Sequence, residues 1–173
     1  MFRKYMAATT LIFAALICRA VIAQNAIVTF YSIPDQLSHE LKESVSLFGK
    51  TSFRGYAFDG DQQLAHLSAG RFIAFELPAG HHVFSATLHK HHANGKYALA
   101  VELKPGERYF IRMTSKWKSA VVVPVVLYDH QLEFVTCPVA IQENAGSHSV
   151  EAKQVSSNAR VSMVQGAAFQ TCD

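Results

Sequence analysis

The chain lacks the short motifs by which many hydrolases and metalloproteases are recognised, because neither G-x-S-x-G nor H-E-x-x-H occurs in it. Charge is also scarce: only 17% of the residues are Asp, Glu, Lys or Arg. Arg3, Lys4 and Arg19 account for the whole formal net charge of +3. A nucleic-acid binder needs clustered Lys and Arg. We therefore expect neither an enzyme nor a nucleic-acid-binding protein, and no cofactor.

A long hydrophobic run is absent except near the N-terminus, where residues 1–23 have the pattern of a secretory signal peptide. Arg3 and Lys4 form its charged start, and the apolar core Ala7–Ile17 is too short to span a bilayer comfortably. Val21–Ala23 offers a cleavage site, so the mature chain is expected to begin at Gln24. The alternative is an uncleaved N-terminal anchor. If the segment is cleaved, the protein contacts the membrane only through residues 1–23 and only before cleavage.

Cysteine is rare, with only Cys18, Cys137 and Cys172. Ala15–Ile17 lacks the small residue expected directly before a lipid-modified cysteine, so we favour a soluble exported protein, periplasmic or extracellular, over a lipid-anchored one. After export, Cys137 and Cys172 remain, and an oxidising compartment favours a disulfide between them. The alternative is two free thiols, with Cys137 a small core residue.

Short apolar runs alternate with Gly- and Pro-marked turns about every ten residues from Phe58 to Arg112. Gly80 and Gly95 are expected at positive φ in two of these turns. Each run hides one face only, which favours antiparallel pairing. The sequence therefore predicts a single all-β domain, an antiparallel β-sandwich of immunoglobulin-like or related type. Expected strands in this stretch are Gln63–Leu67, Arg71–Leu77, Val83–His89, Tyr97–Leu103 and Tyr109–Met113.

The same stretch carries a resemblance. Its frame is Asp59-Gly60, then GRFIAFELPAGHHVF from Gly70, then LKPGERYFIR from Leu103. This frame resembles a family of small bacterial exported proteins and lipoproteins, filed only as a domain of unknown function. The resemblance covers about 27–126 and rests on turn glycines and strand hydrophobics. It implies an architecture and an envelope location, and it brings no catalytic residues.

Strands are also expected on both sides of that stretch, at Ala26–Ser32, Thr51–Phe58, Ala120–Tyr128 and Leu132–Val139. Asp35–Leu47 is either a short helix or an irregular loop. From Gln142 the composition shifts to Ser, Asn, Gln, Ala and Gly. We therefore expect a β-domain over 24–141 and a loosely ordered tail over 142–173. Within that tail, Arg160–Phe169 is either a last weak strand or disordered.

Histidine is the one chemically suggestive residue type, with nine in the chain. His89, His91 and His92 share a hairpin loop and could bind Zn²⁺, Cu²⁺ or Ni²⁺. No Cys or carboxylate lies in the same loop, so a solvated polar loop is the better interpretation. His81 and His82 lie at the other end of the intervening strand. We expect an exported, non-enzymatic binding or structural module that meets an envelope protein or a surface ligand. Weak transition-metal binding is the alternative.

Overall fold

The computed structural model describes residues 25–33, 54–88, 97–118, 127–150, 162–164 and 172. Strands make up most of these residues, and one short helix follows the last long strand. The elements are β1 (Ala26–Tyr31), β2 (Arg54–Asp59), β3 (Gln62–Ser68), β4 (Arg71–Leu77), β5 (Gly80–Thr87), β6 (Leu99–Leu103), β7 (Arg108–Lys118), β8 (Leu127–Val135), α3 (Cys137–Glu143), β9 (His148–Ser149) and β10 (Ser162–Val164).

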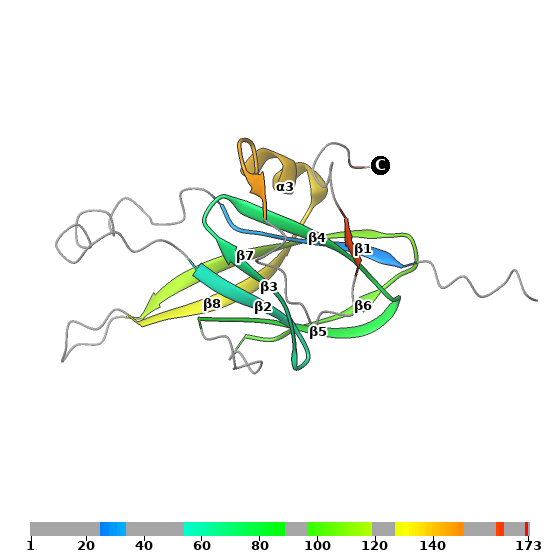
Figure 1. Ribbon diagram of the computed structural model, residues 1–173, viewed down its shortest axis with the longest axis horizontal. Helices are drawn as coiled ribbons and strands as arrows, with labels where there is room; N and C mark the ends of the chain where they lie inside the picture. The colour runs from blue at the N-terminus through cyan, green and yellow to red at the C-terminus, as the bar shows by residue number, and fades with distance from the viewer. Residues whose placement is uncertain are drawn as a thin grey trace, which may run out of the picture.

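Two sheets face each other, as Figure 1 shows. One sheet has the order β10-β4-β1-β7-β8, with β9 also paired to β4, and the other has the order β3-β2-β5-β6. The chain changes sheet at both turns of β4, which pairs with β1 while its neighbours β3 and β5 both pair with β2. The expected all-β, sandwich-like architecture is therefore confirmed.

The expectation of purely antiparallel pairing is wrong at β1. This strand lies antiparallel to β4 but parallel to β7, with Ile27 opposite Arg108 and Tyr31 opposite Arg112. Five of its six residues are buried. A strand buried on both faces is the usual setting for parallel pairing. β9 and β4 also pair in parallel.

Alternation along β1 and β7 divides their side chains between two apolar clusters. Val28, Phe30 and Ile111 point between the sheets and belong to the main core. Tyr31 and Phe110 point to the outer face of the same sheet and pack with Ala140 of α3 in a second cluster. β4 has the predicted bounds, and three alternate residues on its inward face are fully or almost fully buried: Ile73, Phe75 and Leu77.

The expectation of a strand over Leu132–Val139 is wrong after Val135, because α3 begins at Cys137. Thr136 has extended backbone angles at the N-cap position, and Pro138 lies in the first turn of the helix. Proline suits that turn, because its fixed φ is helical and its missing N–H would have no helical partner. The expected boundary between the β-domain (24–141) and the loosely ordered tail (142–173) falls inside this helix.

Parts of the C-terminal region add to the sheet. β9 and β10 lie along the same edge of β4, and the backbone N–H of Val150 donates to Phe72 O at 2.8 Å. They cover an edge that would otherwise expose unpaired backbone groups. A strand at Ser162–Val164 falls within the segment expected to be either a weak strand or disordered.

Several expectations lie outside the described residues and stay predictions. They are the signal peptide over 1–23, the element over 35–47, the strand residues 120–126, the loop with His89, His91 and His92, Gly95, and most of the tail beyond Val150. Gly80 is described and has the expected positive φ, 132°.

Candidate functional site

A notch opens where β8 ends. β8 pairs with β7 only as far as Val135, opposite Phe110, and the chain then turns into α3. β7 begins two residues earlier, at Arg108, so this end of β7 extends past β8. On the facing sheet, β6 is the edge strand. The resulting pocket has a volume of about 340 Å³ and is lined by Val101, Arg108, Tyr109, Phe110, Phe134, Val135, Thr136 and Cys137.

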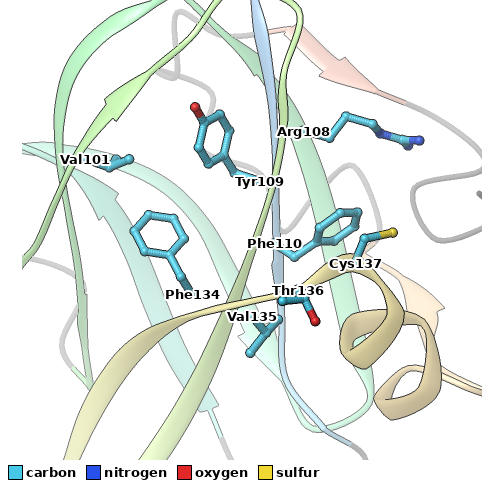
Figure 2. Close-up of a pocket in the computed structure, with 8 residues that line it drawn as sticks. All are labelled: Val101, Arg108, Tyr109, Phe110, Phe134, Val135, Thr136 and Cys137. Atoms are coloured by element: carbon cyan, nitrogen blue, oxygen red, sulfur yellow. The ribbon is translucent and has the colours of Figure 1, made fainter. Parts of the chain in front are cut away.

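The lining of this notch is mainly apolar. Figure 2 shows Tyr109 and Phe134 on one side of β7, and Arg108 and Phe110 on the other. The rings of Tyr109 and Phe134 have centroids 6.2 Å apart, and Phe134 is 38% exposed although it is a large apolar residue. Arg108 is the one charged residue among the eight that line the notch. Pockets of this composition hold small, mostly apolar molecules and orient them with a few polar groups.

The Tyr109 side chain is fixed by the turn between β6 and β7. Its hydroxyl accepts from the backbone N–H of Lys104 at 3.0 Å and donates to Glu107 Oε2, 2.9 Å away. Lys104 and Glu107 form an ion pair at 3.4 Å. These contacts hold the Tyr109 ring as a preformed wall of the notch, which lowers the entropic cost of binding against it.

α3, whose first residue Cys137 lines the notch, is joined to the sheet by a polar network beside the second cluster. Tyr31 donates its hydroxyl proton to Glu143 Oε2 at 2.6 Å. Arg112 pairs with Glu143 through Nη1 and with Glu133 through Nη2, the latter at 2.8 Å. Burial and the hydrogen bond to Glu143 raise the pKa of Tyr31 well above 10. The hydrogen bond to Glu133 raises the pKa of Arg112 further, so this guanidinium stays charged.

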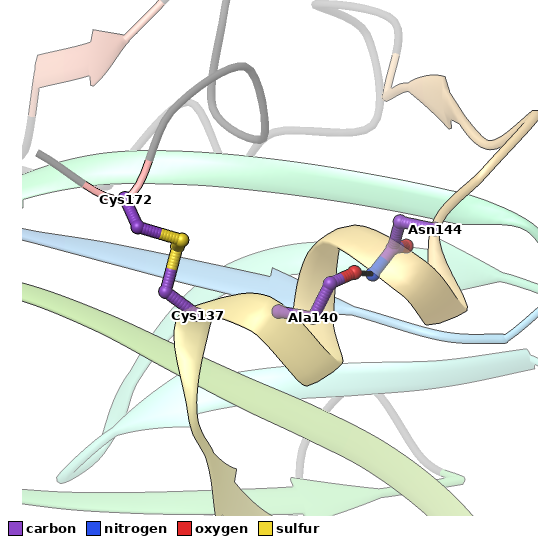
Figure 3. The surroundings of a disulfide bond; sticks show 4 residues. All are labelled: Cys137, Ala140, Asn144 and Cys172. Atoms are coloured by element: carbon purple, nitrogen blue, oxygen red, sulfur yellow. Dashed lines mark hydrogen bonds between the residues drawn. A yellow bond between two sulfur atoms is a disulfide. The ribbon is translucent and has the colours of Figure 1, made fainter.

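A disulfide joins the first residue of α3 to the C-terminal end of the chain. The Cα atoms of Cys137 and Cys172 are 5.6 Å apart, within the range that disulfides span. Figure 3 shows the bond beside the helix, together with the hydrogen bond from the Asn144 side chain to Ala140 O at 2.8 Å. Because Cys137 also lines the notch, the disulfide fixes the part of the lining where α3 begins.

A serine–histidine pair lies between the sheets. His130 Nε2 is 2.9 Å from Arg54 O and therefore donates to it, while Nδ1 accepts from the Ser115 hydroxyl at 3.0 Å. His130 is only 5% exposed. The pair therefore connects β8 to β2 across the core, and its burial argues for a structural tie between the sheets over a reactive nucleophile.

Of the residues that the sequence singled out, His82 and Asp59 come together. His82 Nδ1 is 2.7 Å from Asp59 Oδ2, and Nε2 is 2.9 Å from Pro78 O. Both ring nitrogens face acceptors, so both bonds form together when the ring carries two protons. The neighbouring His81 is exposed, and its Nδ1 lies 3.8 Å from Glu102 Oε2. Across the described part of the chain, no three His, Cys, Asp or Glu side chains gather as a metal site.

Sequence reasoning did not find the notch or the network beneath α3. Arg112 lies inside the predicted strand Tyr109–Met113, and Glu143 lies in the segment expected to be loosely ordered. Their contact joins positions 31 residues apart. No local pattern could have indicated it. Phe110 is 3% exposed and packs beneath α3.

Among the described residues, no helix has the length and apolar character needed to cross a membrane. Comparison of the chain with family models, curated proteins and solved structures gave no match in any of the three.

Proposed function

We propose that this chain is an exported, non-enzymatic β-domain that binds a ligand of the cell envelope or its surroundings. The observation that carries the proposal is the notch beside β7, whose apolar wall includes the exposed Phe134. Surface concavities with exposed aromatic walls are typical binding sites. The resemblance to small exported domains and the signal-like residues 1–23 support the compartment. We also propose that the sandwich is of immunoglobulin-like or related type.

The close polar groups of the described residues support a binding role over a catalytic one. His130 and Ser115 connect the two sheets, Tyr31 and Arg112 hold α3, and His82 is paired at both ring nitrogens. None of these groups lines the notch. Chemistry would need reactive groups inside the concavity, whereas recognition needs only its shape and its apolar lining.

Binding is tested by thermal unfolding in the presence of small molecules extracted from bacterial envelopes. A ligand that binds only the folded state raises the melting temperature. We expect stabilisation of the wild type and of Leu88→Ser, and none of Phe134→Ser. Leu88 is the matched control, because it is 42% exposed and lies outside the notch. Equal stabilisation of all three proteins, or of none, would contradict binding at this site.

Export is tested separately, by expressing the full chain in a bacterial host and sequencing the N-terminus of the protein from each cell fraction. We expect the exported protein to begin at or close to Gln24. Accumulation of the uncleaved chain in the cytoplasm would contradict the compartment.

A further inference from the structure

We infer that the notch takes one unbranched hydrocarbon chain, such as the alkyl chain of a lipid, and binds it without recognising a charged head group. The inference rests on the proposed binding function and names the class of its ligand. Three observations carry it. The notch opens into the main core, the polar groups beside that opening are engaged or point elsewhere, and the lining follows a bend that a flexible chain can match.

The inner part of the notch, lined by Val101, Tyr109 and Phe134, is an opening into the main core. Val101 and Tyr109 are partly buried and pack against the cluster between the sheets. Phe134 lies on the same face of β8 as the buried Leu132, yet it is 38% exposed. The core is therefore left open here, between the edge strands β6 and β8. An apolar ligand in this opening removes further apolar surface from water, which stabilises the complex.

The polar groups beside this opening offer a ligand little. Tyr109 gives its hydroxyl proton to Glu107 and accepts from the backbone N–H of Lys104. In Figure 2 the Arg108 side chain extends away from the inner part of the notch. A ligand group that needs hydrogen bonds would lose water there without gaining a partner, which costs free energy. The inner part therefore favours a hydrocarbon segment over a polar or charged one.

The shape of the notch favours a flexible chain. Tyr109 and Phe110 are successive residues of β7, so their side chains lie on opposite faces of the sheet, and both line the notch. β8 ends opposite Phe110, and the notch therefore passes around the edge of β7 from one face to the other. An unbranched chain can bend around this edge, whereas a rigid ring system cannot. The volume of about 340 Å³ is near the lower limit for ligand pockets, roughly 300 Å³, and fits one chain better than a whole lipid.

The test is an NMR titration of the full mature protein with 1-butanol, 1-hexanol and 1-octanol, whose chains differ only in length. We expect the dissociation constant to fall about two- to fourfold for each added methylene group, because each one buries more apolar surface. The largest amide shifts should be those of Val101, Tyr109 and Phe134. An affinity that does not change with chain length would overturn the inference.

Three further probes separate an alkyl chain from other ligands. Octanoate and octylamine share the chain of 1-octanol and should bind within about threefold of it, because an exposed head group adds little. A preference of about tenfold or more for either charge would overturn the neutral assignment. Cyclooctanol should bind more weakly than 1-octanol, and equal binding would exclude an unbranched chain. N-acetylphenylalanine amide, if it binds more tightly than 1-octanol, would identify a protein side chain as the occupant and overturn the lipid chain.

Variants locate the binding. Phe134→Ala should weaken 1-octanol binding about tenfold, whereas Phe134→Leu should retain most of the affinity because it keeps an apolar wall. The matched Leu88→Ala should bind as the wild type does. Unchanged affinity in Phe134→Ala, with its amide spectrum still that of a folded protein, would overturn binding at the notch. If no alcohol binds although the envelope extract stabilises the protein, the ligand class is wrong and the proposed binding function stands.

Discussion

The two apolar clusters of this protein share strands but differ in how they are held together. Between the sheets, Phe30 meets Phe75 and Phe84 edge to face, with ring centroids 6.4 and 5.2 Å apart. Beneath α3, Tyr31 and Phe110 pack with one short helix. The first cluster is closed by two sheets. The second depends in addition on the Arg112–Glu143 ion pair and the Cys137–Cys172 disulfide.

This difference indicates which part of the molecule can open first. A helix of seven residues is too short to be stable by itself, so α3 depends on its side-chain contacts and its cross-link. Regions with few buried apolar contacts open at lower free energy than the core. Because Cys137 begins α3 and lines the notch, one end of the proposed ligand site borders the more easily opened layer.

The largest expected effect separates the two clusters by cavity formation. Phe30→Ala should lower the free energy of unfolding by about 3–5 kcal/mol, because the two sheets cannot close over the cavity. Phe110→Ala should cost less, because α3 can move towards the sheet. Urea unfolding of both variants gives the values. Equal losses of unfolding free energy would mean that α3 is held against its sheet as firmly as the two sheets are held together.

The next effect concerns the close approach of β2 to β7 and β8. A Cβ atom on Gly55 would lie 2.7 Å from Met113 Sδ and 3.3 Å from His130 Nε2. Gly55→Ala should therefore cost about 1–3 kcal/mol through overpacking. The cost should fall in the Met113→Ala background, where room is available. A cost that is the same in both backgrounds would exclude crowding as its cause.

A smaller effect is expected at the network beneath α3. Tyr31→Phe removes one hydrogen bond and should cost about 1 kcal/mol at neutral pH. The raised pKa of Tyr31 stabilises the fold below pH 10, and this contribution is lost as the pH rises above 10. Unfolding measurements from pH 8 to 11 should therefore show a steeper alkaline loss in the wild type than in Tyr31→Phe. Parallel curves would contradict the assigned cause.

The smallest effect is expected on the outer face of the β3-β2-β5-β6 sheet. There His66 stacks on Tyr56, with ring centroids 4.6 Å apart. Burial and the nearby charge of Arg54 lower the pKa of His66. The contribution of this pKa shift to stability is present above pH 6.5 and is lost as the pH falls below that value. His66→Gln should reduce the acid sensitivity of the melting temperature between pH 7 and 5. An unchanged acid sensitivity would exclude His66 as its source.

Much of the first cluster could be predicted from the sequence, because it arises from local alternation. The strand Arg71–Leu77 is found at the predicted bounds, and its alternate residues Ile73, Phe75 and Leu77 are buried. The second cluster could not be predicted in the same way. The predicted strand Leu132–Val139 runs through Pro138, where proline can end a strand or begin a helix, and the residues that follow it are compatible with either.

The notch also depends on contacts between residues that are far apart in the sequence. It exists because β8 stops opposite Phe110 while β7 continues to Arg108, a matter of register between strands. The parallel pairing of β1 with β7 is another such relation, since periodicity shows which face of a strand is buried but not the direction of its neighbour.

Amide hydrogen exchange before and after reduction of the Cys137–Cys172 disulfide tests most directly whether α3 is a separable layer. We expect Ala140 and Asn144 to lose protection on reduction, while Phe30 and Ile111 between the sheets keep theirs. A double Cys137→Ser, Cys172→Ser variant should reproduce the reduced pattern. If all four amides lose protection together, or if α3 is unaffected, the two clusters are one cooperative unit and the proposed distinction between them is wrong.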